Sequence, residues 1–180
     1  SIVYTTSVTD EYKRRLENGS YTFKNTITAK VNGTDVKASA DKTVNADKWI
    51  EKTCIGFDDT TRTLTWDVTL NIPNDVTDVV IRDYVQDADR HVLQPTVTYA
   101  GTTIVNSGTI VDSSIVKSWE SAWQGYSMAL TDAFVSSHAG QLITFTYTSV
   151  IPDGYVWNNQ TEFTNKAHLS YKDAVLGDQN

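Results

Sequence analysis

The stretch Leu64-Thr65-Trp66-Asp67-Val68-Thr69-Leu70 alternates strictly between apolar and polar side chains. Successive side chains of a β-strand point to opposite faces, so the apolar residues share one face and the polar residues share the other. This pattern predicts a strand that covers a hydrophobic core with one face and meets solvent with the other. Residues 71–75 include Pro73 and predict the turn that follows.

Strand-like segments recur along the rest of the chain. They are rich in Thr and Val and are separated by Asn, Asp and Gly, which is typical of a β-sandwich. The further predicted strands are residues 79–83, 92–99, 102–105, 109–111, 142–150 and 162–171. Residues 127–135 differ: they predict a short helix with Ser127 as its N-cap, in a segment that ends at Gly140. We therefore expect an all-β sandwich with one short crossover helix.

Length and composition restrict the function further. The chain has 180 residues, of which 39% are apolar and 21% charged, enough for one globular domain and part of another. A formal net charge of −7 argues against binding to a phosphate backbone. The longest apolar runs fall well short of the roughly 18 residues that span a membrane. We expect no nucleic-acid partner and no membrane span in this segment.

The residue types that usually carry catalysis or bind metals are scarce or scattered. Cys54 is the only cysteine, which excludes an intramolecular disulfide and a cysteine-based zinc site. His91, His138 and His168 lack metal-ligand spacing. Neither a Gly-x-Ser-x-Gly motif nor a glycine-rich phosphate loop is present. We expect that the protein uses no cofactor or metal and is not an enzyme that acts on other molecules.

Three polar residues fall on predicted inward faces: Lys52, Asp83 and Asn165. Their apolar neighbours on the same faces are Ile50 and Cys54, then Val79 and Ile81, and finally Phe163, Ala167 and Leu169. An unpaired charge in a core costs several kcal/mol, or its pKa shifts until the group is neutral. Burial should therefore favour a neutral lysine amine and a protonated aspartic acid.

Those neutral forms suit one reaction. A neutral Lys52 amine is a nucleophile, and the Asn165 carboxamide is an electrophile. A protonated Asp83 can polarise the carboxamide carbonyl and carry a proton to the leaving group. The product would be a Lys52–Asn165 amide crosslink, with loss of ammonia. Lys42 also precedes a threonine and alternates with apolar residues, so it is the alternative nucleophile.

Each residue also has an ordinary interpretation. Lys52 could be a solvated strand lysine. Asp83 could cap a turn or form an unreacted ion pair with Lys52. Asn165 could hydrogen-bond neighbouring backbone.

The stretches Ile50-Glu51-Lys52-Thr53-Cys54, Thr63–Asn71, Val79-Val80-Ile81-Arg82-Asp83 and Phe163-Thr164-Asn165 together resemble a known family. They are similar to the collagen-adhesin-type immunoglobulin-like domains of Gram-positive surface proteins and pilins. The resemblance spans roughly residues 41–176, with Cys54 in place of the glycine of the usual Lys-Thr-Gly motif. Lys52 and Asp83 are 31 positions apart, and Asp83 and Asn165 are 82 apart.

This resemblance implies an immunoglobulin-like sandwich with a self-catalysed Lys52–Asn165 isopeptide bond, assisted by Asp83. It also implies an extracellular, cell-wall-anchored location on a Gram-positive bacterium. The implied partners are adjacent modules of the same surface protein and, for an adhesin, a host matrix protein.

The two ends of the chain resemble each other, which indicates a tandem repeat. Residues 6–8 and 23–29 match residues 148–150 and 163–169, so that Asn25 corresponds to Asn165. We expect residues 1–40 to be the terminal strands of a preceding module and residues 41–180 to be the immunoglobulin-like isopeptide domain. Asn25 should be unbonded in this chain, because the lysine that it needs would precede residue 1.

Three functions are therefore considered. The first is a structural or adhesive module locked by the crosslink, and the second is an adhesin domain that binds a host matrix protein. The third is a carbohydrate-binding sandwich without a crosslink, which would expose aromatic side chains that otherwise fill the core. Those aromatic residues are Trp119, Trp123, Tyr126, Tyr155 and Trp157.

Overall fold

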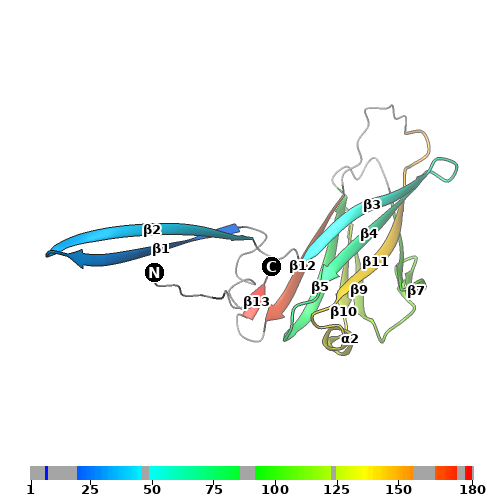
Figure 1. The fold of residues 1–180 in the computed structure, drawn as a ribbon. Coiled ribbons are helices and arrows are strands. Elements are labelled where there is room, and N and C mark those ends of the chain that lie inside the picture. The colour runs from blue at the N-terminus through cyan, green and yellow to red at the C-terminus, as the bar shows by residue number, and fades with distance from the viewer. Residues whose placement is uncertain are drawn as a thin grey trace. The chain divides into compact units, whose positions relative to one another are not determined.

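The computed structural model describes Ser7 and residues 20–45, 49–85, 92–122, 125–155, 165–173 and 177–179. The chain divides into two compact units, Ser1–Lys48 and Trp49–Asn180. The first unit contributes a β-hairpin and the second a β-sandwich (Figure 1).

The hairpin consists of β1 (Ser20–Val31) and β2 (Thr34–Asn45), which pair antiparallel along their whole length. Asn32 and Gly33 form the connection, with φ of 51° and 79°. Two consecutive positive φ values match the tight turn that the right-handed twist of a hairpin favours, and Asn-Gly is its preferred sequence. The turn therefore sets the register of the two strands.

The sandwich has two antiparallel sheets. The first has five described strands in the order β13-β12-β5-β10-β9, and the second has six in the order β3-β4-β11-β6-β7-β8. The bounds of the first are Gly177–Gln179 (β13), Asn165–Asp173 (β12), Val76–Val85 (β5), Gly125–Leu130 (β10) and Val116–Ala122 (β9). Those of the second are Ile50–Asp58 (β3), Thr63–Asn71 (β4), Leu142–Val150 (β11), Val92–Tyr99 (β6), Thr102–Asn106 (β7) and Thr109–Ile110 (β8).

The core lies between these sheets, where the alternation of the sequence predicts it. The apolar residues of β4 are all buried, as are Val79 and Ile81 of β5. From β11, the side chains of Ile143, Phe145 and Tyr147 enter the same core. The predicted all-β sandwich is confirmed.

The crossover helix is present, but it begins later than predicted. Residues 125–130 form β10, which pairs with both β5 and β9. Met128 and Leu130 of this strand are buried in alternation, so the apparent helical pattern was a strand pattern. The helix α2 spans Asp132–Ser137, and its N-cap is Thr131, whose hydroxyl accepts from the Phe134 N–H at 3.2 Å.

Two expectations about individual side chains can also be compared with the fold. Cys54 is exposed rather than buried. It pairs with Trp66 on β4, and the register of the two strands shifts directly after this pair, between Cys54 and Gly56. The predicted strand at 162–171 is described from Asn165 onward, and Phe163 lies outside the described residues.

The aromatic residues described in the structure contribute to the core. Tyr126 is buried and stacks on Trp119 with ring centroids 4.4 Å apart. Trp119 and Tyr155 are partly buried and pack against the core cluster. Trp123 and Trp157 lie outside the described residues. The core-filling interpretation therefore holds for the three aromatic residues that the structure describes.

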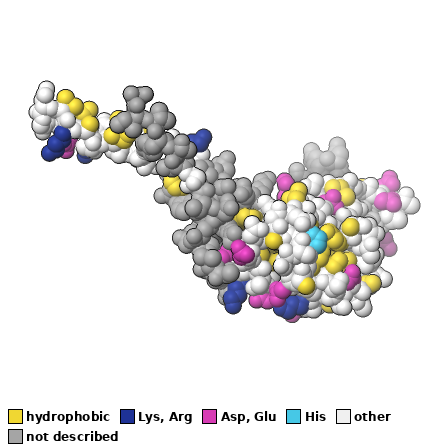
Figure 2. All heavy atoms as spheres, turned by 60° about the horizontal axis from the view of Figure 1, so that its bottom comes forward, with side chains coloured by type: hydrophobic (Ala, Val, Ile, Leu, Met, Phe, Trp, Pro, Cys, Tyr) yellow, Lys and Arg dark blue, Asp and Glu magenta, His cyan; other side chains and the backbone are white. Residues whose placement is uncertain are grey.

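The surface of the sandwich is mixed. On the face shown in Figure 2, hydrophobic side chains are scattered among polar and charged ones. In the described part of the chain, no helix has the length and apolar character needed to cross a membrane. Nor do the described His, Cys, Asp and Glu residues gather in threes as a metal site would require.

Candidate functional site

The three inward polar residues come from three strands and both sheets. Asp83 on β5 pairs with Ala167 on β12, and Asn165 begins β12 opposite Val85. Asp83 and Asn165 thus lie on adjacent strands of one sheet. Lys52 comes from β3 of the other sheet, and β3 lies beside β12 (Figure 1). The sandwich therefore brings Lys52 toward the β5–β12 pair from the opposite layer.

Lys52 and Asp83 meet in the interior. The Lys52 side chain is 6% exposed, and its Nζ forms an ion pair and hydrogen bond with Asp83 Oδ2. Asp83 as a residue is 1% exposed. A buried ion pair is retained against a large desolvation cost, so these two residues require a functional or architectural explanation.

Tyr147 joins all three polar residues. Its hydroxyl donates to Asp83 Oδ2 at 2.6 Å and accepts from Asn165 Nδ2 at 2.7 Å. Lys52 Nζ donates to the same hydroxyl oxygen. Tyr147 projects inward from β11 and is 1% exposed. The amine and the carboxamide therefore share one buried hydroxyl.

Two oxygen atoms of the cluster remain unsatisfied. Among the described residues, Asp83 Oδ1 and Asn165 Oδ1 are buried and have no hydrogen-bond partner. Buried polar atoms without partners are rare, because each costs about 1–3 kcal/mol. The Asn165 carbonyl oxygen is thus available for a donor, and a proton on Asp83 Oδ1 would supply one.

Burial shifts both ionisable groups toward neutrality. It lowers the pKa of Lys52 to about 8, although the charge and hydrogen bond of Asp83 oppose that shift. It raises the pKa of Asp83 to about 6, although the charge and hydrogen bond of Lys52 oppose that shift. Desolvation is the larger cause in each case, because both charged forms lose water. The site therefore favours a neutral amine beside a neutral acid more than solvent would.

Aromatic rings surround the amine. Lys52 Nζ lies 5.0 Å from the centroid of Trp66 and 4.5 Å from the centroid of Tyr147. The indole of Trp66 is fixed by a hydrogen bond from Nε1 to Ser149 Oγ at 2.9 Å. These rings exclude water from the amine while their faces still tolerate a transient positive charge.

A glycine allows β10 to approach Asp83 closely. A Cβ at Gly125 would lie 1.7 Å from the carbonyl oxygen of Asp83 and 2.7 Å from its carbonyl carbon. Any other residue would push the backbone of β5 away at the position that carries the acid. The place of Asp83 thus depends on a residue that makes no side-chain contact.

The alternative nucleophile lies elsewhere. Lys42 is on β2 of the hairpin, where it pairs with Phe23 and is exposed. Asn25, the counterpart of Asn165, is on β1 and is also exposed. Neither belongs to the unit that contains Asp83 and Asn165.

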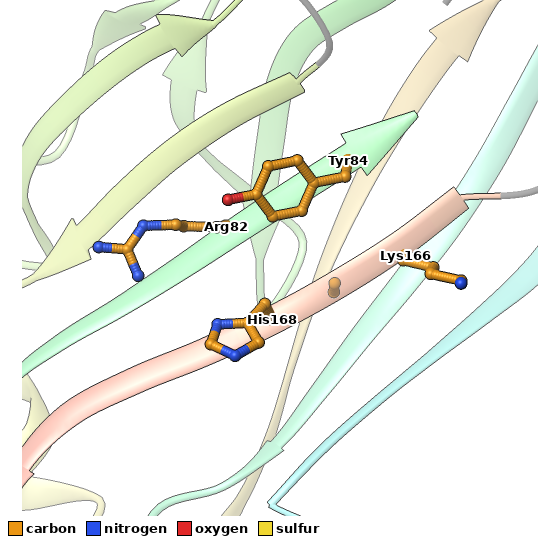
Figure 3. Close-up of a pocket in the computed structure, with 5 residues that line it drawn as sticks. Arg82, Tyr84, Lys166 and His168 are labelled. Atoms are coloured by element: carbon orange, nitrogen blue, oxygen red, sulfur yellow. The ribbon is translucent and has the colours of Figure 1, made fainter. Parts of the chain in front are cut away.

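A hollow of about 460 Å³ lies on the opposite, outer face of β5 and β12. Its lining includes Arg82 and Tyr84 from β5 and Lys166 and His168 from β12, which project from one face of the sheet (Figure 3). The Arg82 guanidinium donates to Ser170 Oγ at 2.7 Å. Because residues alternate along a strand, this hollow is separate from the buried cluster around Asp83.

Tyr147 and Trp66 are site residues that the sequence pattern alone does not predict. Both lie on strand faces that the alternation predicts to be buried. A buried tyrosine usually finds a partner for its hydroxyl. That rule was the available signal, but it does not say which partner the hydroxyl meets.

Comparison with known proteins shows the fold. No protein-family description and no curated protein sequence matches the chain significantly. The pilus backbone protein of Streptococcus pneumoniae matches with a TM-score of 0.50 at 13% identity, covering 69% of this chain and 52% of that one. The full-length major pilin of the same organism also gives 0.50, at 12% identity over 77% of this chain and 27% of that one.

A collagen-binding domain from a Staphylococcus aureus adhesin gives a TM-score of 0.48 at 16% identity, covering 76% of this chain and 93% of that one. This chain spans about half of the first pilin structure, at 52%. The pilin matches confirm the predicted immunoglobulin-like fold. The resemblance proposed from the sequence therefore holds at the level of the fold.

Proposed function

We propose that this chain is a structural module of a bacterial surface protein or pilus, locked by a self-formed amide bond between Lys52 and Asn165. The observation that carries the proposal is the convergence of Lys52, Asp83 and Asn165 on one buried hydroxyl. An ordinary core would not retain an amine, an acid and a carboxamide together, because each costs free energy to bury.

The chemistry follows from the neutral forms of the groups. Asp83 takes the proton of the Lys52 ammonium, which leaves a neutral amine beside a neutral acid. The amine attacks Cγ of Asn165, while a proton on Asp83 Oδ1 stabilises the developing charge on the unsatisfied Asn165 Oδ1. One proton must then move from Nζ to Nδ2 before the C–Nδ2 bond breaks and ammonia leaves.

The bond would suit a protein under tension. Lys52 lies near the start of the sandwich, in β3, and Asn165 begins β12 near its end. With the two residues joined, the shortest covalent path through the unit runs from residue 52 directly to residue 165. A pull on both ends would load this path, and residues 53–164 would carry no tension. An amide also resists the reductants that break disulfides.

The hairpin supports a neighbouring module as a partner. Strand alternation places apolar and polar residues on opposite faces of β1 and β2. One face carries Asn25 and the large side chains of Ile27, Val31 and Val36, each more than half exposed at 55%, 54% and 53%. An isolated two-stranded hairpin is marginally stable, so this face needs a cover. We therefore propose that the hairpin, which continues past residue 40 to Asn45, provides strands of a neighbouring module.

The surface favours a structural role over a ligand-binding one. The exposed large hydrophobics of the described sandwich are dispersed over three strands and the bend after β8: Ile55, Phe57, Tyr84, Val111 and Leu142. The matched pilins are consistent with an extracellular location on a Gram-positive surface, where cell-wall anchoring would bear load.

Intact mass tests the proposed bond directly. The purified chain should weigh less than its sequence mass by one ammonia, because amide formation expels Nδ2. Peptide mapping should recover one branched species that joins the peptides of Lys52 and Asn165, while the Asn25 peptide stays linear. The full sequence mass would refute the proposal, and a branch at Asn25 or Lys42 would refute this assignment of residues.

The rate of bond formation should depend on pH as a bell. Between about 6 and about 8, the pKa values of Asp83 and Lys52, the pair holds one proton, so the neutral pair is populated at a constant level. Below that window a second proton keeps Lys52 charged, and above it Asp83 loses its acid proton. The rate should therefore fall on both sides, by up to about tenfold per pH unit.

To measure this profile, chain isolated unreacted in denaturant can be diluted into buffers of different pH and its mass followed with time. Circular dichroism in parallel would show that folding precedes the reaction. A rate that rises steadily with pH would contradict the shared-proton arrangement, since it would require only a deprotonated lysine.

A further inference from the structure

The position of the buried Tyr147 hydroxyl suits a role beyond satisfying the hydrogen bonds of its neighbours. Bond formation requires a proton to leave Nζ of Lys52 and another to reach Nδ2 of Asn165. Tyr147 Oη contacts both nitrogens: it accepts from Nδ2 at 2.7 Å and from Nζ. It also donates to Asp83 Oδ2 at 2.6 Å. The described residues thus place one proton-carrying oxygen between the entering and leaving nitrogens.

We propose that Tyr147 is a catalytic residue of the crosslinking reaction, the proton carrier that passes a proton from the Lys52 amine to the departing nitrogen of Asn165. The inference rests on the proposed crosslink and refines it. Asp83 polarises the carbonyl, whereas the phenol moves the proton.

The atoms balance without an outside reactant. Attack forms the Nζ–Cγ bond and moves the carbonyl electron pair onto Oδ1, where the acid proton of Asp83 stabilises it. Tyr147 Oη then takes one proton from Nζ on a lone pair, while its own hydroxyl proton turns from Asp83 Oδ2 to the lone pair that Nδ2 gains in the tetrahedral intermediate. The C–Nδ2 bond breaks, the carbonyl re-forms, and ammonia leaves. Tyr147 ends as the neutral phenol with which it began.

The division of labour follows from the contacts of the carboxyl group. Asp83 Oδ2 is engaged by Lys52 and by the phenol, and Oδ1 is unsatisfied, as is Asn165 Oδ1. A proton on Asp83 Oδ1 would serve the carbonyl oxygen. The Asn165 side chain also hydrogen-bonds to the Asp83 carboxyl group, but the Tyr147 oxygen lies 2.7 Å from the nitrogen that must leave and also contacts the Lys52 amine.

The test compares the wild type with three variants, each isolated unreacted in denaturant and then folded by dilution. Tyr147→Phe keeps the ring and removes the hydroxyl. It should form the crosslink on the order of 100-fold more slowly than wild type, or slower still, as expected when a general acid–base group is lost. Tyr99→Phe is the matched control, because Tyr99 also packs on the core and its hydroxyl bonds instead to His138 Nε2 at 3.0 Å. The control should react at the wild-type rate.

The third variant separates chemistry from packing. Fluorotyrosine placed at position 147 keeps the shape and the hydroxyl, so it should restore the fast crosslinking that Tyr147→Phe loses. Its more acidic phenol should alter the alkaline limb of the rate profile. If wild type crosslinks and Tyr147→Phe crosslinks equally fast, Tyr147 is not the carrier, although the proposed function stands. If fluorotyrosine fails to restore the reaction, the role of the hydroxyl is overturned. A wild-type chain of full sequence mass would overturn both proposals.

Discussion

Replacing Lys52 with alanine should remove the ammonia deficit and lower the melting temperature of the sandwich on the order of 10–20 °C. The proposed bond closes a loop of just over 110 residues, counted from Lys52 to Asn165. A loop of that length constrains the unfolded chain by roughly 4–5 kcal/mol in the entropy description used for disulfides. The fold itself should persist, because Lys52 is on an edge strand and the core of β4, β5 and β11 is intact.

A double-mutant cycle separates the bond from the packing of the side chain. Lys52→Ala and Asn165→Ala should each cost the crosslink, whereas the double variant loses it only once. The sum of the two single losses in free energy of unfolding should therefore exceed the loss in the double variant by roughly 4–5 kcal/mol, the contribution of the closed loop. Additive costs in calorimetry would show that no bond is shared between the two residues.

Lys42→Ala provides the matched control. Lys42 also lies on a strand and also precedes a threonine, but it is exposed in the hairpin unit. This variant should keep the ammonia deficit and the wild-type melting temperature of the sandwich. If the Lys42→Ala chain had the full sequence mass, Lys42 would be the nucleophile and the assignment to Lys52 would be refuted.

The alternation of apolar and polar residues predicts most of the strands of the fold. Leu64–Leu70 is a half-buried strand because its period of two matches the pleat, and the same rule placed Asp83 beside Val79 and Ile81. The rule fails where the strand period of two and the helical period of 3.6 both fit the same few residues. Residues 127–135 mix the end of β10 with the start of α2, and strand pairing on both sides of β10 decides in favour of the strand.

The candidate site was predictable only in part, for a related reason. A lysine, an acid and an asparagine on apolar faces violate the pattern, so Lys52, Asp83 and Asn165 could be found by inspection. Tyr147 does not violate it, because a tyrosine on a buried face resembles ordinary core. Its role depends on which hydroxyl, amine and carboxyl groups the two sheets bring together, and that information is tertiary.

Asp83→Ala should fold and remain uncrosslinked, with Lys52 and Asn165 both present and the full sequence mass retained. In the proposed reaction the carboxyl group takes the Lys52 proton and polarises the Asn165 carbonyl, so its removal should slow the reaction on the order of 100-fold to 10,000-fold. Asp83→Asn is the companion variant, since it keeps the volume of the buried side chain but cannot take the lysine proton. Both are followed by intact mass after dilution from denaturant, with circular dichroism to confirm folding.

Asp67→Ala is the control for the Asp83 variants, because it also removes a carboxylate from a strand. Asp67 on β4 accepts a hydrogen bond from the Thr146 hydroxyl at 2.6 Å, so it is also hydrogen-bonded across strands. It lies on the face of β4 opposite the buried one. Its removal should leave the crosslink complete. If Asp83→Ala and Asp83→Asn crosslinked as fast as Asp67→Ala, the buried acid would have no part in the reaction. The raised pKa of Asp83 would then reflect only the cost of burying a carboxyl group beside Lys52.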